Sequence, residues 1–170
     1  MNRNELDALR LAAAREPPMT RVALDDIANP YSVRQDLQRA FRRSMDSHES
    51  TEQLLDRLQG VVDMSRSRAR TIAQTERTRA QNGSRYAQAI EEYLAAYEKA
   101  VKNHRKRPEK PVFQWVNPRT AKEPRPHHVS VSGTKKPIGE QFLPNLRYPG
   151  DPQAPASEVI NCHCYIRRVR

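Results

Sequence analysis

Prolines divide this sequence more sharply than any other residue type. Ten of the 13 prolines follow residue 101, and proline breaks a helix because it lacks an amide hydrogen and its ring clashes with the preceding turn. Charge changes at the same point: residues 1–100 carry 16 Lys and Arg against 15 Asp and Glu, whereas residues 101–170 carry 14 against 5. The sequence therefore predicts an α+β fold. N-terminal helices, including one long helix, precede a small, basic, loop-rich C-terminal part with short antiparallel strands.

The composition limits the size of the core and the cellular context. Only 36% of the 170 residues are hydrophobic and the mean hydropathy is -0.92, so we expect a modest core and much solvent-facing or partner-facing surface. No run of about 18 apolar residues is present, which predicts no membrane contact. The opening MNRNELDALRLAAAREPP contains acidic residues and no apolar centre, unlike a secretory signal. We therefore expect a reducing cytoplasm, where stable disulfides are rare.

Four stretches have the periodicity of amphipathic helices: residues 4–15, 32–46, 47–62 and 65–103. Ser50 and Gln53 fit a capping box in the third stretch. The fourth stretch predicts one long helix, and Asn82-Gly83 is its expected weak point because glycine costs about 1 kcal/mol inside a helix. We divide the chain into an N-terminal helical extension, 1–48, and a main domain, 49–170, that is helical over 49–105 and rich in strands and loops over 106–170.

Beyond residue 110, alternating runs separated by turn residues predict short strands. These runs are VFQWV at 112–116, HVSVSG at 128–133 and VINCHCYIRRV at 159–169. In a regular strand, side chains two residues apart point to the same face. The last run therefore places Cys162 and Cys164 on one face, together with Ile160 and Ile166, and His163 on the other.

Cys162 and Cys164 are the only cysteines in the chain, and their pattern leaves several roles open. A disulfide between them is the least favourable, because strand neighbours two apart lie near the upper limit of about 7 Å between Cα atoms and their side chains are parallel. A structural zinc, the one cofactor considered, usually needs four Cys or His ligands. His127 or His128 would supply the third, and no fourth is evident. The alternatives are small buried hydrophobic side chains or a reactive thiol.

A second group of polar residues lies on the predicted long helix. Thr75, Glu76 and Arg79 fall on one side of it with Ile72, and a polar pair among apolar neighbours needs partners. Arg125 in the C-terminal part is a candidate partner. We interpret Glu76 as part of a structural salt bridge, because no GxGxxG, P-loop, HExxH or GxSxG motif is present. No catalytic residue is assigned, and the chain is not expected to be an enzyme.

Several short motifs, taken in order, resemble the C-terminal domain of the Mu F-like phage head morphogenesis proteins. The stretches are TIAQTERTRAQNGSR, FQWV, RPHHVSVSG, Phe142, YPGDP and INCHC, against a family pattern of approximately I-A-R-T-E, W, R-x-x-H-x-x-x-x-G, F, P-G-D and N-C-R-C. The chain departs from this pattern at Gln74 and His163, where the family carries Arg, and at Ala121, where the family often has an acidic residue. Carried onto this sequence, the motif residues are Ile72, Ala73, Thr75, Glu76, Trp115, Arg125, His128, Gly133, Asn161, Cys162 and Cys164.

The resemblance covers roughly residues 50–166 and implies a minor head protein of a tailed phage or prophage. Such a protein is a low-copy component of the virion head, assembled in the bacterial cytoplasm, with portal or capsid proteins and packaged DNA as partners. The positive charge beyond residue 101 separately favours a polyanion, nucleic acid first; the alternative is that it serves solubility alone. Candidate residues for non-specific phosphate contacts are Lys102, Arg105, Lys106, Arg107, Lys135 and Lys136.

Two other functions fit the same residues. One is a metal-dependent nuclease or similar hydrolase that uses Glu76, His128, Cys162 and Cys164. The other is a small zinc-stabilised DNA-binding module without catalysis, in which the two cysteines and His128 hold the metal.

Overall fold

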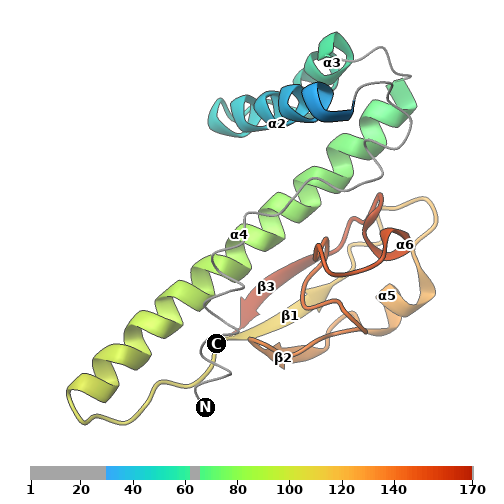
Figure 1. Ribbon diagram of the computed structural model, residues 1–170. Helices are drawn as coiled ribbons and strands as arrows, with labels where there is room; N and C mark the ends of the chain where they lie inside the picture. The colour runs from blue at the N-terminus through green and yellow to red at the C-terminus, as the bar shows by residue number, and fades with distance from the viewer. Residues whose placement is uncertain (1–29, 62–65, 170) are drawn as a thin grey trace.

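The computed structural model describes residues 30–61 and 66–169, so the helix expected at 4–15 lies outside the described residues. The α+β architecture is confirmed: one long helix lies beside a small three-stranded antiparallel sheet (Figure 1). No helix in these residues is long and apolar enough to cross a membrane. The elements are α2 (Pro30–Asp46), α3 (Thr51–Val61), α4 (Arg66–Lys102), β1 (Val112–Val116), α5 (Pro126–Ser130), β2 (Lys135–Pro137), α6 (Ala156–Val159) and β3 (Tyr165–Val169).

Helices α2 and α3 pack against the N-terminal half of α4 (Figure 1). The predicted capping box starts α3: the Ser50 amide donates to Gln53 Oε1 at 2.8 Å, and the Gln53 amide donates to Ser50 Oγ at 3.3 Å. The expected domain boundary at residue 48 falls between α2 and α3, and it stays a prediction. The apolar faces of all three helices share one cluster, made of Leu37, Ala40, Leu54, Leu55, Leu58, Ala69, Ile72 and Ala73.

The long helix α4 runs through Asn82-Gly83 without interruption. The space left by the absent Gly83 side chain is bordered by the Tyr148 ring, 3.8 Å from where a Cβ would lie. Two residues after the helix ends at Lys102, His104 adopts the left-handed conformation, with φ 51°. The Arg105 amide donates to the Ala100 carbonyl at 2.8 Å and the His104 amide to Val101 at 3.2 Å, the pattern of a Schellman-type C-terminus.

The sheet has the order β2-β1-β3, and both pairings are antiparallel. Trp115 in β1 lies opposite Ile166 in β3, and both side chains are buried. The sheet covers the C-terminal half of α4 (Figure 1). Most of the core lies between them and consists of Tyr86, Ala89, Ile90, Tyr93, Leu94, Tyr97, Phe113, Trp115, Ile138, Leu146, Tyr148, Val159, Cys162, Cys164 and Ile166.

Two of the predicted strands are wrong in part. The run at 128–133 is not a strand: residues 126–130 form the short helix α5, with Pro126 at its first position, where the missing amide costs nothing. The short strand β2 follows it instead. The last run, 159–169, begins at the final residue of helix α6, and Asn161 adopts φ 51°, so the chain turns before β3 begins at Tyr165.

The turn YPGDP lies directly on α4 and fixes the distance between the two parts. Gly150 has φ +83°, and a Cβ built there would lie 2.7 Å from the Arg79 Cα atom. Only glycine accepts both this backbone conformation and this close approach. Asp151, which is fully buried, holds the turn closed by accepting hydrogen bonds from Arg147 and from the Gln153 amide.

Candidate metal centre

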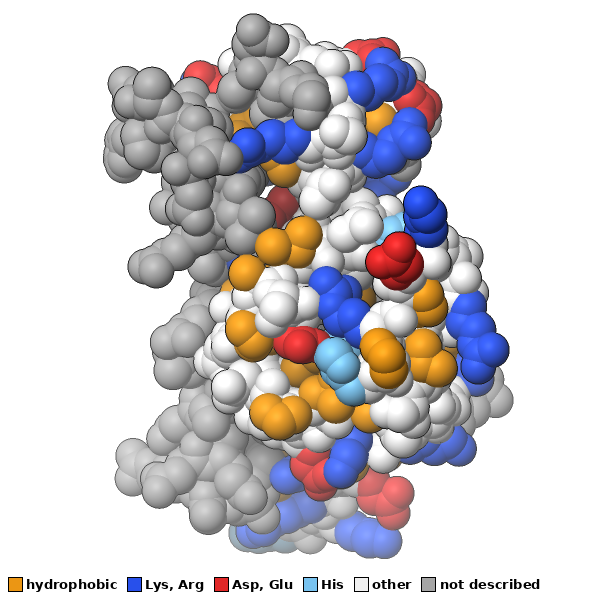
Figure 2. All heavy atoms as spheres, turned by 90° about the vertical axis from the view of Figure 1, so that its right-hand side faces the viewer, with side chains coloured by type: hydrophobic (Ala, Val, Ile, Leu, Met, Phe, Trp, Pro, Cys, Tyr) orange, Lys and Arg blue, Asp and Glu red, His pale blue; other side chains and the backbone are white. Residues whose placement is uncertain are grey.

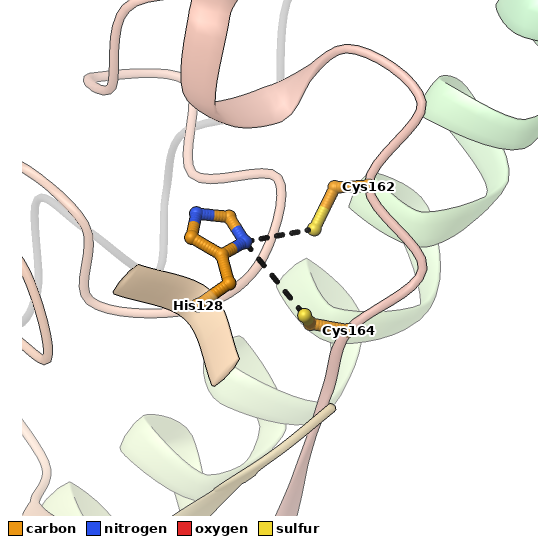
Figure 3. A group of neighbouring side chains, drawn as sticks. All are labelled: His128, Cys162 and Cys164. Carbon is orange, nitrogen blue, oxygen red and sulfur yellow. Dashed lines mark hydrogen bonds between the residues drawn. The ribbon is translucent and has the colours of Figure 1, made fainter. Parts of the chain in front are cut away.

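Three buried side chains from two segments meet next to α4: His128 from α5, and Cys162 and Cys164 from the stretch that leads into β3. The Nδ1 atom of His128 lies 3.6 Å from the Cys162 sulfur and 3.7 Å from the Cys164 sulfur (Figure 3). All three residues are at most 4% exposed. The predicted alternation therefore holds for the two thiols, which point the same way although the regular strand begins only at Tyr165.

A row of polar side chains on α4, here called the polar seam, holds the cysteine segment by its backbone. The seam consists of Gln74, Thr75, Thr78 and Asn82. Thr75 Oγ1 accepts a hydrogen bond from the Asn161 amide at 2.8 Å, and Thr78 Oγ1 donates to the Cys162 carbonyl at 2.7 Å.

The rest of the seam continues the same contacts along the segment. Gln74 Nε2 lies 3.4 Å from the Cys162 carbonyl. Asn82 Oδ1 accepts a hydrogen bond from the Ile166 amide at 2.9 Å, and Asn82 Nδ2 donates one to the Cys164 carbonyl at 3.3 Å. Because an irregular segment cannot satisfy its own backbone groups, side chains of α4 replace the missing partners.

The second ring nitrogen of His128 is fixed by a carboxylate. His128 Nε2 lies 2.8 Å from Glu158 Oε2 in α6, and His127 Nε2 lies 2.7 Å from the same oxygen. Partial burial alone would raise the pKa of Glu158, but the hydrogen bonds and charges of the two histidines outweigh it and lower that pKa. With Nε2 occupied by Glu158, Nδ1 is the His128 ring nitrogen that faces the two sulfurs.

The two thiols have opposite titration behaviour. A hydrogen bond from Cys164 is the largest cause that lowers the pKa of Cys162 to about 5; burial opposes it, and a hydrogen bond from His128 contributes further. The same bond and burial raise the pKa of Cys164. The indole N–H of Trp115 favours the Cys164 thiolate by proximity, although its geometry is not that of a hydrogen bond. Of the two sulfurs, Cys162 is therefore the one favoured as a thiolate.

The arrangement is that of a candidate metal site. One nitrogen and two sulfur atoms lie within 4.8 Å of one another. The rings of Trp115 and His128 pack edge to face, with centroids 5.2 Å apart. A cavity of about 430 Å³ opens on the other side of the three residues. It is lined by His128, Asn117 and residues 121–125 and 160–164.

The structure brings most of the predicted site residues together. Arg125 donates to the Ile160 carbonyl at 2.8 Å and lies in the cavity wall. Gly133, at φ 91°, donates its amide to the Trp115 carbonyl at 2.8 Å and so places the turn after α5 against β1. Glu76 lies apart from the cavity lining and is 3.5 Å from Arg79, a pair in which both side chains are buried.

The six predicted phosphate-contact residues lie in two places away from the cluster. Lys102, Arg105, Lys106 and Arg107 are exposed at the end of α4, and Lys135 and Lys136 belong to β2.

Sequence reasoning missed Thr78, Asn82 and Glu158. The spacing of Thr75, Thr78 and Asn82, at i, i+3 and i+7, is a helical face, and this signal could have identified the seam. Nothing in the sequence near Glu158 indicates that its carboxylate meets His128, 30 residues earlier.

The fold and cluster define an α+β protein with a buried group of two cysteines and one histidine. Comparison with protein-family models, with curated proteins and with solved structures found no match.

Replacing Thr78 by Val keeps the shape of the side chain and removes the 2.7 Å hydrogen bond to the buried Cys162 carbonyl. We expect Thr78→Val to lower the free energy of unfolding by about 1 to 2 kcal/mol, measured by urea unfolding. Thr71→Val is the matched control. Thr71 Oγ1 donates to the Ser67 carbonyl at 3.2 Å, an exposed hydrogen bond within α4 that does not involve the cysteine segment. Its effect should stay within about 0.5 kcal/mol. Equal losses in the two variants would show that the seam does not hold the segment.

Proposed function

We propose that this chain is a minor head protein of a tailed phage or prophage, and that a zinc ion organises its C-terminal part. The observation that carries the proposal is the convergence of the motif residues. Residues as far apart as Thr75 and Cys164 belong to separate motifs of the Mu F-like pattern, and they meet around one cluster. A pattern that builds one structural unit supports the resemblance more strongly than isolated short matches do.

The residues at the individual motif positions make contacts that stabilise the backbone and the core, as suits an assembly protein. Asn161 adopts a left-handed backbone, which asparagine tolerates better than most residues. Trp115 is fully buried against His128 and Phe142. Gln74, which replaces the family's Arg, still reaches the Cys162 carbonyl. These contacts use the motif to hold backbone and core in place.

Zinc fits the donor set better than other common ions. Thiolate sulfur and imidazole nitrogen are its usual protein ligands. In a tetrahedral site with Zn–S of about 2.3 Å and Zn–N of about 2.0 Å, nitrogen and sulfur ligands lie about 3.5 Å apart, close to the 3.6 and 3.7 Å found here. The contact from Glu158 to the far nitrogen of His128 is the typical outer partner of a metal-bound histidine. Zinc would cross-link α5 to the segment before β3.

The basic residues support non-specific contact with DNA in the head. Lys102, Arg105 and Lys106 are exposed on the segment that follows α4, and Arg107 lies over the Tyr97 ring at 5.4 Å. Lys136 is 3.6 Å from Glu140 and so partly neutralised. On the face in Figure 2, Lys and Arg side chains are spread along its height rather than gathered in one patch. Scattered charge suits phosphate contacts without sequence readout, and the helical part, α2 and α3, remains for a portal or capsid partner.

The position of Glu76 does not support the hydrolase alternative, which needs this carboxylate beside the metal ligands. Glu76 pairs with buried Arg79 and does not line the cavity beside the cysteines. A hydrolase would need another general base there, whereas the zinc-stabilised DNA-binding module needs no catalytic group and differs from the first proposal only in its biological setting.

The zinc proposal predicts one zinc per chain, measured by elemental analysis of purified protein. With free zinc at about 1,000 times its Kd, binding to the folded state alone adds about 4 kcal/mol. A chelator should therefore lower the Tm by about 8 to 16 °C. Cys162→Ser and His128→Ala should lose the metal. His104→Asn, at an exposed left-handed position, should keep it, and a chelator without effect on the Tm would exclude a structural zinc.

Non-specific DNA contact predicts a steep salt dependence of binding. Each phosphate contact contributes about -0.9 to the slope of log affinity against log salt concentration. Alanine at Lys102, Arg105, Lys106 and Arg107 together should flatten the slope by as much as about 3 to 4, measured by fluorescence anisotropy on two unrelated duplexes. The matched control removes Arg66 and Arg70, which already pair with Glu52. Affinity that is equal at low and high salt would contradict the mechanism.

The biological setting predicts that the chain is a component of the particle. Mass spectrometry of nuclease-treated, DNA-filled heads from the source phage or induced prophage should find it at a few copies per portal ring. A chain that is abundant in the lysate and absent from the particles would instead indicate an assembly-only factor or a soluble enzyme.

A further inference from the structure

The cluster offers three metal ligands and borders a cavity. Among residues 30–61 and 66–169, no fourth Cys, His, Asp or Glu ligand atom lies within 4.8 Å of all three. The cavity of about 430 Å³ has His128, Cys162 and Cys164 in its wall, so a metal ion held by them would face it. Structural zinc sites are usually closed by four protein ligands, whereas three ligands with one open position are typical of sites that bind an exogenous molecule.

The other sides of the cluster are filled. Thr78 and Asn82 of the polar seam bind the carbonyls of Cys162 and Cys164. The Trp115 ring packs against the His128 ring, and Glu158 Oε2 lies 2.8 Å from His128 Nε2. The cavity is therefore the side from which a fourth ligand can reach the ion.

The side chains of the cavity wall indicate the charge of that ligand. Arg125 is half-buried and held at the Ile160 carbonyl at 2.8 Å, and exposed Lys122 lies in the same wall. Glu123 is the acidic residue of the lining. A zinc ion with two thiolates and a neutral imidazole has no net charge, so the wall carries a net charge of about +1 in favour of an anion.

We propose that the fourth coordination position is open to this cavity and takes a small oxygen anion of the carboxylate or phosphate class, with Arg125 as its counter-charge. This rests on the proposed zinc site. His163, the wall residue best able to close the site, has its Nδ1 atom 3.2 Å from Thr120 Oγ1, and it lies outside the three-residue group.

The test uses the full chain loaded with Co²⁺, whose d–d absorption reports the ligands of the ion. Titration with inorganic phosphate, and separately with acetate, should shift the band saturably; the anion that binds at lower concentration identifies the class. Arg125→Ala should weaken that binding at least tenfold and leave the anion-free spectrum unchanged. Arg125→Lys should recover part of the loss, and Lys135→Ala, on β2, should have no effect.

The remaining outcomes separate this proposal from the zinc site itself. If neither anion shifts the band, and His163→Ala or Glu123→Ala alters the anion-free spectrum, the protein supplies its own fourth ligand. The open position would then be wrong and the metal site would stand. If neither anion shifts the band and neither variant changes the spectrum, the open position is also overturned. A chain that binds neither Co²⁺ nor Zn²⁺ would overturn both proposals.

Discussion

The contact on which the site depends is the pairing of α4 side chains with the backbone of residues 161–166. Residues 161–164 precede β3 and lie outside its ladder with β1, and the buried amides and carbonyls of the segment would each cost about 1 to 3 kcal/mol if left unpaired. Thr75, Thr78 and Asn82 supply the partners from one helical face. The helix thereby sets where both sulfurs lie, and the sulfurs in turn face His128.

The helix can do this because its two halves serve different cores. The apolar residues Ala69, Ile72 and Ala73 pack with α2 and α3, while Tyr86, Ile90 and Tyr93 pack beneath the sheet. The polar seam lies between these apolar contacts, where the cysteine segment crosses. The close approach at Gly150 belongs to the same constraint, since the turn must lie against Arg79 for the sheet to reach the helix. One continuous helix of 37 residues keeps both cores in register.

Local patterns predicted the elements well where one periodicity dominated. The long helix, the capping box at Ser50 and the strand at 112–116 are of this kind. The run at 128–133 failed because Val129 and Val131 alternate by coincidence in a helix and turn started by Pro126, and so short a run cannot separate the two periods. The common direction of the two thiols was predicted correctly. The partner of His128 was not, because Glu158 reaches it only through the folding of a distant turn.

The buried pair of Glu76 and Arg79 bears on how the motif should be understood. The Glu76 carboxylate lies 3.5 Å from the Arg79 guanidinium, and both side chains are buried. Glu76 lies apart from the cavity lining and its partner Arg79 lies against the Gly150 turn, so the pair has a structural task. Thr75 and Gly133 likewise have hydrogen-bond partners within the fold, and the Trp115 ring is fully buried. The motif residues that also face open space are Arg125, His128 and the residues around the two cysteines. We expect a small ligand to bind at this wall of the cavity, where Arg125 and His128 are in reach of it.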